Sequence, residues 1–442
     1  MFVKQKKYTL ILAAFIIMFC SYANARELSG FVLKNKKEGW YPTGVPMIRY
    51  NTDDGFGYGI RAVIYNNGYA EEPYFNFSPY FHMFSIQLFQ TTQGKREFTL
   101  KTDMPYFRKT RMRVFTSFSY AEEQNANYFG SGPESMRLTG KDGKEYLDYE
   151  DYKKEFLIGY GSGGEYYKYN KYSIMRPDMD LYGYYEIFDD IKIMAGLRFR
   201  YTRVDPWGGR SFDIDDDRNN THLSDVVSAP TLIEELGLQD QDGWINTVKT
   251  GIGYDTRDYE PDPGDGIFTD AAIVAATGII GSEYEYLRLT LCFRWYKTIL
   301  RDVTLAMRAA ATTVSGSVPF HELGYFSFLT EDQSALGNSR TLRGYRSHRF
   351  AGRSMTNANA EIRWECIDLV AMKQRFALKI IAFCDTGSVF NSMEESVYTW
   401  NNYRTGYGGG LAVTWNQAFV LHLYAGFSRE DRSISVDAGH AI

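Results

Sequence analysis

The feature that most constrains this chain is a two-residue alternation of apolar and polar side chains, sustained over runs of about ten residues. Such runs occupy Ile191–Tyr201, Leu287–Tyr296 and Phe419–Phe427. Because a β-strand has a period of two, each run places its apolar residues on one face and its polar residues, such as Arg198 and Arg200, on the other. Beyond the first 25 residues, no apolar stretch reaches the length of a membrane-spanning helix. The pattern therefore predicts an all-β chain.

Composition favours a membrane-embedded barrel over a soluble β-sandwich, which would show the same alternation. Aromatic residues make up 16% of the 442 residues, and there are 40 glycines. The mean hydropathy of −0.37 excludes a bundle of membrane helices, and the net charge of −5 argues against a nucleic-acid partner. A transmembrane β-wall needs strands of this length, interfacial aromatic side chains and a polar inner face. We therefore predict a transmembrane antiparallel β-barrel of about 16 strands.

The start of the chain has the features of an export signal. Lys4–Lys7 is basic, Tyr8–Phe19 is apolar but too short to span a bilayer, and Ala23–Ala25 offers the small residues of a cleavage site. We predict a signal peptide at residues 1–25, a short periplasmic segment at residues 26–43 and an outer-membrane barrel at residues 44–442. The expected location is the outer membrane of a Gram-negative bacterium.

A motif in the second half of the chain narrows the prediction. Leu342-Arg343-Gly344-Tyr345 resembles the apolar-Arg-Gly-aromatic loop motif of the BamA/TamA superfamily, also called the bacterial surface-antigen family. Three further segments follow the family's order: Asp255-Thr256-Arg257-Asp258, Asn359–Arg363 and Phe383–Gly387. The resemblance spans Pro46 to Ile442. It resembles a form that lacks the periplasmic (POTRA) domains of the best-studied members, so we expect no such domain here.

The resemblance implies a loop anchor inside the barrel. The segment Val318–Arg353 would be an extracellular loop that folds into the lumen, with Arg343, Gly344 and Tyr345 at its anchor. In the family the arginine meets acids on the inner wall, which here would be Glu361 and Asp385. The alternation of faces along a strand supports this, because each acid falls on the face opposite the more uniformly apolar one, which is the face expected to line the lumen. A guanidinium can bind a carboxylate through two parallel hydrogen bonds, which a lysine cannot.

The resemblance also implies a non-enzymatic assembly or translocation factor. In the family, a seam between poorly paired first and last strands lets a nascent strand add at the open edge. Here the seam would join the strand around Pro46–Tyr50 to the one around Ser433–Ile442, with Ile48 near Val436. The expected partners are outer-membrane lipid and lipopolysaccharide, nascent outer-membrane proteins and a periplasmic or lipoprotein partner. We expect no cofactor, no metal and no nucleic acid.

Two other functions stay open at this stage. Lumen arginines (Arg198, Arg200, Arg288 and Arg294) would suit a low-conductance channel with anion preference. A structural surface antigen would act through its loops alone. The acidic run Asp213–Asp217 begins like a calcium loop, but Arg218 and Ser224 replace the required Gly and Glu, so a solvated surface loop is the default interpretation.

Overall fold

The computed structural model describes residues 33–34, 36–160, 164–188, 190–206, 230–260, 262–334, 336–371, 374–396, 402–415 and 419–438. The predicted signal peptide and the acidic run Asp213–Asp217 lie outside the described residues. No helix in these ranges is long and apolar enough to cross a membrane.

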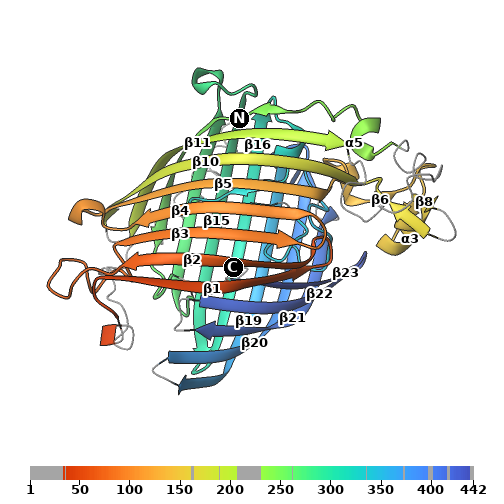
Figure 1. The fold of residues 1–442 in the computed structure, drawn as a ribbon. Coiled ribbons are helices and arrows are strands. Elements are labelled where there is room, and N and C mark those ends of the chain that lie inside the picture. The colour runs from red at the N-terminus through yellow and green to blue at the C-terminus, as the bar shows by residue number, and fades with distance from the viewer. Residues whose placement is uncertain are drawn as a thin grey trace, which may run out of the picture.

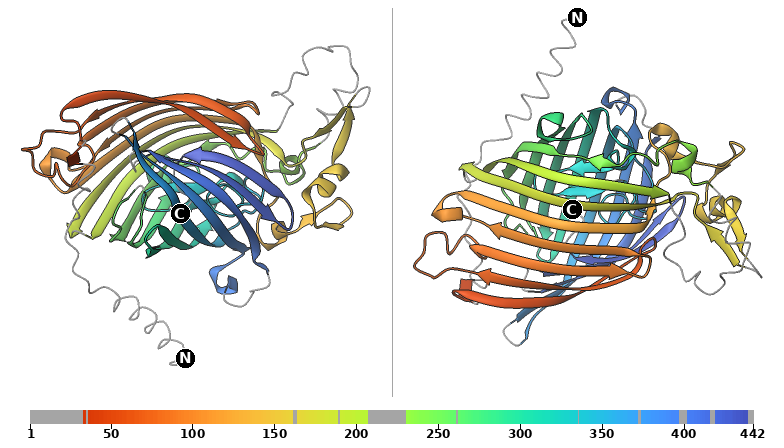
Figure 2. Two further views of the ribbon diagram at one scale, coloured as in Figure 1. Left: turned by 90° about the horizontal axis from the view of Figure 1, so that it is seen from below. Right: turned by 45° about the horizontal axis from the view of Figure 1, so that its top comes forward.

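The described strands form one closed antiparallel barrel with a 16-strand wall, which confirms the predicted fold class (Figures 1 and 2). The wall strands are β1 (Trp40–Asn51), β2 (Gly55–Asn66), β3 (His82–Thr91), β4 (Lys95–Met104), β5 (Met112–Asn127), β10 (Lys171–Phe188), β11 (Ile191–Pro206), β13 (Thr247–Asp255), β14 (Gly266–Ala276), β15 (Tyr286–Leu300), β16 (Val303–Gly316), β19 (Ser354–Ala371), β20 (Gln374–Phe390), β21 (Arg404–Trp415), β22 (Phe419–Ser428) and β23 (Arg432–Ala438). Each strand pairs with the wall strands before and after it, and β1 meets β23 to close the ring.

The connections differ at the two ends of the barrel. Because successive wall strands alternate in direction, the long segments after β5, β11 and β16 all leave the same end. Figure 1 places α3, β6 and β8 beyond this end. The short elements in the connections are η1 (Phe107–Lys109), η2 (Pro133–Met136), β6 (Leu138–Thr139), β7 (Glu145–Tyr146), α3 (Tyr149–Glu155), β8 (Leu157–Tyr160), β9 (Gly164–Tyr167), α5 (Leu232–Glu235), β12 (Gly243–Trp244), η3 (Gly278–Ile280), η4 (Phe320–Glu322), β17 (Tyr325–Ser327), β18 (Asp332–Ser334) and α6 (Met393–Ser396).

Burial follows the alternation that the sequence shows. On β15, Leu287 and Leu291 are about half exposed (51% and 49%), whereas Arg288 and Arg294 are buried (3% and 6%). On β19, Ile362 is exposed beside the fully buried Glu361. The wall therefore has an apolar outer face and a polar inner face, the arrangement that a barrel in a lipid bilayer requires.

Candidate functional site

Arg343 is buried against the inner face of the wall. Its Nε and Nη2 each donate to Asp385 over 2.7 Å, forming a two-bond fork, and its Nη1 donates to Glu361 over 2.5 Å. The backbone N–H of Arg343 also donates to Asp385, over 3.0 Å. Arg343 is 1% exposed, and both acids are 0% exposed. The structure thus brings together the arginine and the two acids that motif and parity single out.

Further contacts compensate the buried charges. The Glu361 oxygen that Arg343 leaves unused accepts from Arg363 over 2.9 Å, and Asn359 donates to Asp385 over 2.7 Å. The ring of Phe383 lies 3.6 Å below the guanidinium carbon of Arg343. Burial by itself lowers the pKa of Arg343, but the charges of Asp385 and Glu361 outweigh it and raise that pKa above its ordinary value. The anchor is therefore a charged group with satisfied partners, the condition under which a buried ion pair is tolerated.

The two residues after Arg343 let the loop backbone touch the wall. Gly344 has φ +95°, and a Cβ there would come within 2.7 Å of the Phe427 backbone. Two glycines of the wall leave room for this contact. A Cβ on Gly406 would collide with the Arg343 carbonyl, and a Cβ on Gly426 would collide with the Gly344 nitrogen. The N–H of Gly344 donates to the Ser433 Oγ over 2.9 Å. Glycine is thus required on both sides of this contact.

Tyr345 and Gly387 pack around the same contact. Tyr345 is 3% exposed, joins the cluster of buried residues that includes Leu336 and Phe350, and its hydroxyl donates to the Thr405 carbonyl over 3.3 Å. A Cβ on Gly387 would lie 2.9 Å from Leu336, so this glycine makes room for the loop on β20. Both residues therefore belong to the interface between the loop and the wall.

Among the described residues, the seam between β1 and β23 has the fewest backbone pairs of any junction in the wall. β1 pairs with β2 over twelve residues, from Trp40–Asn66 to Asn51–Gly55. On its other edge, the described part of the chain shows two pairs with β23, Tyr50–Val436 and Asn51–Ser435. The expected placement of Ile48 next to Val436 is wrong by two residues, because Tyr50 faces Val436 and Ile48 lies beyond the last pair among the described residues.

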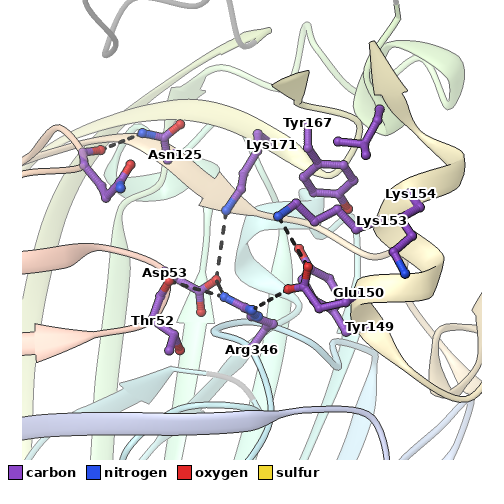
Figure 3. Close-up of a pocket in the computed structure, with 12 residues that line it drawn as sticks. Thr52, Asp53, Asn125, Tyr149, Glu150, Lys153, Lys154, Tyr167, Lys171 and Arg346 are labelled. Carbon is purple, nitrogen blue, oxygen red and sulfur yellow. Dashed lines mark hydrogen bonds and ion pairs between the residues drawn. The ribbon is translucent and has the colours of Figure 1, made fainter. Parts of the chain in front are cut away.

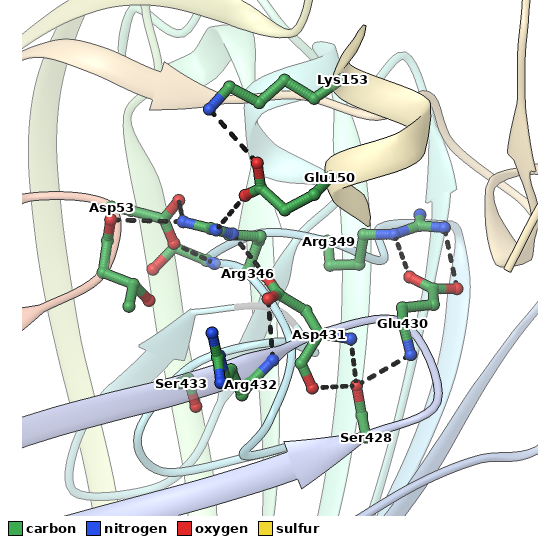
Figure 4. Close-up of polar contacts among 12 residues, drawn as sticks. Asp53, Glu150, Lys153, Arg346, Arg349, Ser428, Glu430, Asp431, Arg432 and Ser433 are labelled. Atoms are coloured by element: carbon green, nitrogen blue, oxygen red, sulfur yellow. Dashed lines mark hydrogen bonds and ion pairs between the residues drawn. The ribbon is translucent and has the colours of Figure 1, made fainter. Parts of the chain in front are cut away.

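Side-chain charges hold the seam where backbone pairs are few (Figure 4). Arg346, three residues after the anchor arginine, donates to Asp431 in the β22–β23 turn over 2.6 Å and to the Thr52 carbonyl in the β1–β2 turn over 3.3 Å. It also lies 3.7 Å from Asp53. Near the C-terminal end of β23, Arg49 of β1 approaches Asp437 to 3.4 Å. We call Arg346 with Asp53 and Asp431 the seam latch.

Sequence reasoning missed the seam latch and the neighbouring pair. Arg349, also buried, donates to Glu430 over 2.8 Å. A signal was present, because Arg340, Arg343, Arg346 and Arg349 recur at every third position of the loop. The acidic partners of Arg346 and Arg349 lie in turns far away in the chain (Asp53, Glu430 and Asp431), and periodicity does not connect them to the loop.

A polar cavity of about 560 Å³ opens beside the latch (Figure 3). Among its lining residues, Lys171 lies 4.0 Å from Asp53 and Lys153 lies 3.6 Å from Glu150. Glu150 also approaches Arg346 to 3.5 Å. The lining contains four cations (Lys153, Lys154, Lys171 and Arg346) and two acids (Asp53 and Glu150), so positive charge is in excess, although the acids pair with three of the four cations.

The Asp255–Asp258 motif lies away from the loop anchor. Asp255 ends β13, and Arg257 donates to its two carboxylate oxygens over 2.8 Å each. Asp258 accepts from the backbone N–H groups of Tyr259 and Gly264 over 2.9 Å each. The β13–β14 connection is at the opposite end of the barrel from the β16–β19 loop. These residues shape a turn there and do not join the loop anchor.

The four arginines that would suit an anion channel are ion-paired. Arg198 contacts Asp180 over 2.6 Å, and Arg294 contacts Asp270 over 2.8 Å. Arg200 and Arg288 both face Glu322 of η4, at 2.9 and 3.7 Å. Their charge is therefore largely compensated. In the described ranges, Cys292, Cys366 and Cys384 are free thiols, and no cluster of three metal-ligating side chains occurs.

Comparison with known proteins gives the same architecture. The family model described as the Omp85 superfamily domain matches residues 84–423, and one described as a domain of unknown function (DUF5982) matches residues 20–81. No curated protein matches the chain.

Two solved barrels are similar in fold. BamA from Haemophilus ducreyi lacking POTRA domains 1–3 aligns with a TM-score of 0.50 and 12% identity, over 91% of this chain and 70% of that one. CdiB from Escherichia coli aligns with a TM-score of 0.51 and 10% identity, over 92% of this chain and 69% of that one. Since the Omp85 model matches well over half of the chain, the protein is an outer-membrane type β-barrel that belongs to the Omp85 superfamily.

Proposed function

We propose that this barrel is a non-enzymatic assembly or translocation factor that acts through the seam between β1 and β23. The observation that carries the proposal is the contrast between the two edges of β1 among the described residues, which end at residue 438: twelve residue pairs with β2 and two with β23. An edge strand with unpaired N–H and C=O groups is a template for another extended segment. Such a step requires positioning and backbone pairing, with no covalent chemistry.

The proposal includes the orientation of the barrel. Outer-membrane barrels have short periplasmic turns and longer extracellular loops. The end with the long segments, including Val318–Arg353, is then extracellular, and both ends of the described chain face the periplasm. The loop enters the lumen from the extracellular side, and its anchor holds β19, β20 and β22 in place while the seam a short distance away stays weakly joined. Nascent outer-membrane proteins, with a periplasmic or lipoprotein partner that delivers them, are the proposed clients.

The experiment is a reversible disulfide lock across the seam. Tyr50→Cys and Val436→Cys are combined in a background in which Cys292, Cys366 and Cys384 are Ser, since directly opposed residues of an antiparallel pair lie within disulfide reach. The matched control is Ile60→Cys with Leu88→Cys, an outward-facing pair between β2 and β3. Both proteins are expressed as the sole copy in the native host, and the amount of folded or exported client barrel protein is measured under oxidising and reducing conditions.

A gating seam predicts that the Tyr50–Val436 lock stops client assembly, that reductant restores it and that the Ile60–Leu88 lock has no effect. Normal assembly with the seam locked would overturn the proposal. Ion conductance or loop-dependent surface binding would then be the activity to measure.

A further inference from the structure

Two of the prolines in the wall strands lie in β1, and their position is informative. Pro42 and Pro46 both fall inside β1, yet its pairing with β2 runs without a register shift through Pro42–Ile64 and Pro46–Ile60. Proline has no N–H to donate to a sheet, so it is tolerated in a strand only where its nitrogen faces away from a paired neighbour. The unbroken pairing indicates that both nitrogens face the other edge, the edge of the seam.

Hydrogen bonds at the open end of the β1–β2 hairpin indicate independently which residues of β1 face the seam. The N–H of Gly39 donates to Gly68 over 2.8 Å, and its C=O accepts from Asn67 over 3.0 Å, so this odd-numbered residue faces β2. On the far side of β2, the even-numbered Asn66 and Phe56 bond toward β3. Because backbone groups alternate between the two edges of a strand, the even-numbered residues of β1 face the seam.

Another wall proline shows what happens when the nitrogen faces a neighbour. Pro177 of β10 pairs with Tyr120 of β5 on one side. On the other side, the pairing of β10 with β11 passes from Met175–Arg203 to Asp178–Arg200 and omits Pro177 and the residue before it. A proline thus interrupts the ladder on the side to which its nitrogen points, and the ladder of β1 with β2 has no such interruption.

The seam edge of β1 is therefore poor in donors. The seam-facing residues that precede Tyr50 in β1 are Trp40, Pro42, Gly44, Pro46 and Ile48. Together they present five carbonyl groups but three N–H groups. A strand added here would lack two of its ladder bonds. Conversely, an unpaired N–H in lipid is strongly unfavourable, and proline removes that penalty at two positions when the edge is open. Both effects shift the edge toward the unpaired state.

We infer that Pro42 and Pro46 keep the β1 edge weakly pairing, so that an antiparallel client strand with alternating apolar and polar residues docks there beside β23 and is released rather than retained. The apolar outward side chains Trp40 and Ile48, 57% and 55% exposed, fit the apolar face of such a strand. The inference rests on the proposed function, because it assigns that edge a client.

The test measures binding of one defined strand to the purified full-length barrel in detergent. The probe is a fluorescent peptide with the sequence of β22, Phe419–Ser428, and a scrambled peptide reports non-specific binding. Pro42→Thr and Pro46→Thr each restore one N–H, and each is expected to tighten peptide binding about 2- to 12-fold. The double variant is expected to bind about 5- to 150-fold more tightly, through slower dissociation. Pro177→Thr is the matched control and should bind like the parent.

Equal binding by parent and double variant would overturn the inference, as would an equal gain from Pro177→Thr. Retention of the folded, heat-modifiable band on electrophoresis is required of each variant, and the two single variants give the answer if the double variant does not fold. The result is separable from the seam lock. Tighter peptide binding together with normal assembly by the locked barrel would refute the proposed function and leave the prolines as protection against edge-to-edge association.

Discussion

Two arginines three residues apart in one loop meet different environments. Arg343 is sealed against Glu361 and Asp385, with all three side chains at most 1% exposed. Arg346 reaches across the seam to Asp431 and Asp53 with a side chain that is 16% exposed. A buried, forked ion pair is difficult to break, whereas a partly hydrated one is screened by salt and exchanges readily. The loop therefore combines a buried, forked attachment to the wall with a partly exposed, salt-sensitive attachment across the seam.

Removing Arg343 should destabilise the barrel most. Arg343→Ala leaves the buried Asp385 without its forked partner and Glu361 paired with Arg363 alone, and we expect a loss of about 3–5 kcal/mol of unfolding free energy. Arg343→Lys should recover little of this, because an ammonium cannot form the fork with Asp385. Arg375→Ala, which removes a partly exposed pair with Asp368, is the control and should lose less than about 1 kcal/mol. Denaturant unfolding in detergent measures all three, and parent-like stability of both Arg343 variants would refute the anchor.

A second prediction concerns acid and the buried start of the same loop. Burial lowers the pKa of His321 to about 4, from an ordinary value of 6.5. The folded state then binds fewer protons than the unfolded state between those values, so stability is lost as the pH falls through this window, by about 2 kcal/mol at pH 5. Burial alone would raise the pKa of Glu322, but Arg200 and Arg288 lower it to about 2, which adds a loss only below about pH 4.5.

Thermal unfolding at pH 7 and pH 5 separates these groups. His321→Gln cannot titrate, so its melting temperature should fall less than that of the parent between the two pH values. Identical pH dependence in parent and variant would show that His321 does not control acid stability.

A third prediction tests the close contact between Gly344 of the loop and the Phe427 backbone of the wall. Gly344→Ala combines an unfavourable φ of +95° with a Cβ 2.7 Å from the Phe427 backbone, and should destabilise the loop by about 1–3 kcal/mol. Gly143→Ala is matched in φ (+76°) but its Cβ would meet nothing within 4 Å. The difference between the two variants in unfolding free energy isolates the cost of the collision, because Gly143 lies in another connection, between β6 and β7. Equal losses would mean that the loop is not held against β22.

The sequence predicts the inner anchor better than the seam latch, for a physical reason. Alternation assigns each strand residue to a face, so the pattern alone is enough to place Glu361 and Asp385 on the inner side of the wall. Pairing Arg343 with them requires a motif in addition to the pattern. Alternation says nothing about register between strands far apart in the chain, and for that reason the sequence predicts Ile48 at the position that Tyr50 occupies. The partners of Arg346, Asp53 and Asp431, sit in turns with no periodicity.

The smallest expected effect is at the seam latch. Arg346→Ala should lower unfolding free energy by about 1 kcal/mol or less. It should instead slow disulfide formation between Cys residues at positions 50 and 436, because the two strands spend less time in register. Raising the ionic strength from about 0.01 to 1 M, which shortens the screening length from roughly 30 to 3 Å, should slow disulfide formation in the parent in the same way. In Arg346→Ala this salt effect should shrink toward the part contributed by Arg49 and Asp437, and in Arg346→Lys it should persist because the charge is kept. If disulfide formation in the parent is insensitive to salt, the charged pairs do not hold the seam together, and the division between a buried and a salt-sensitive arginine fails.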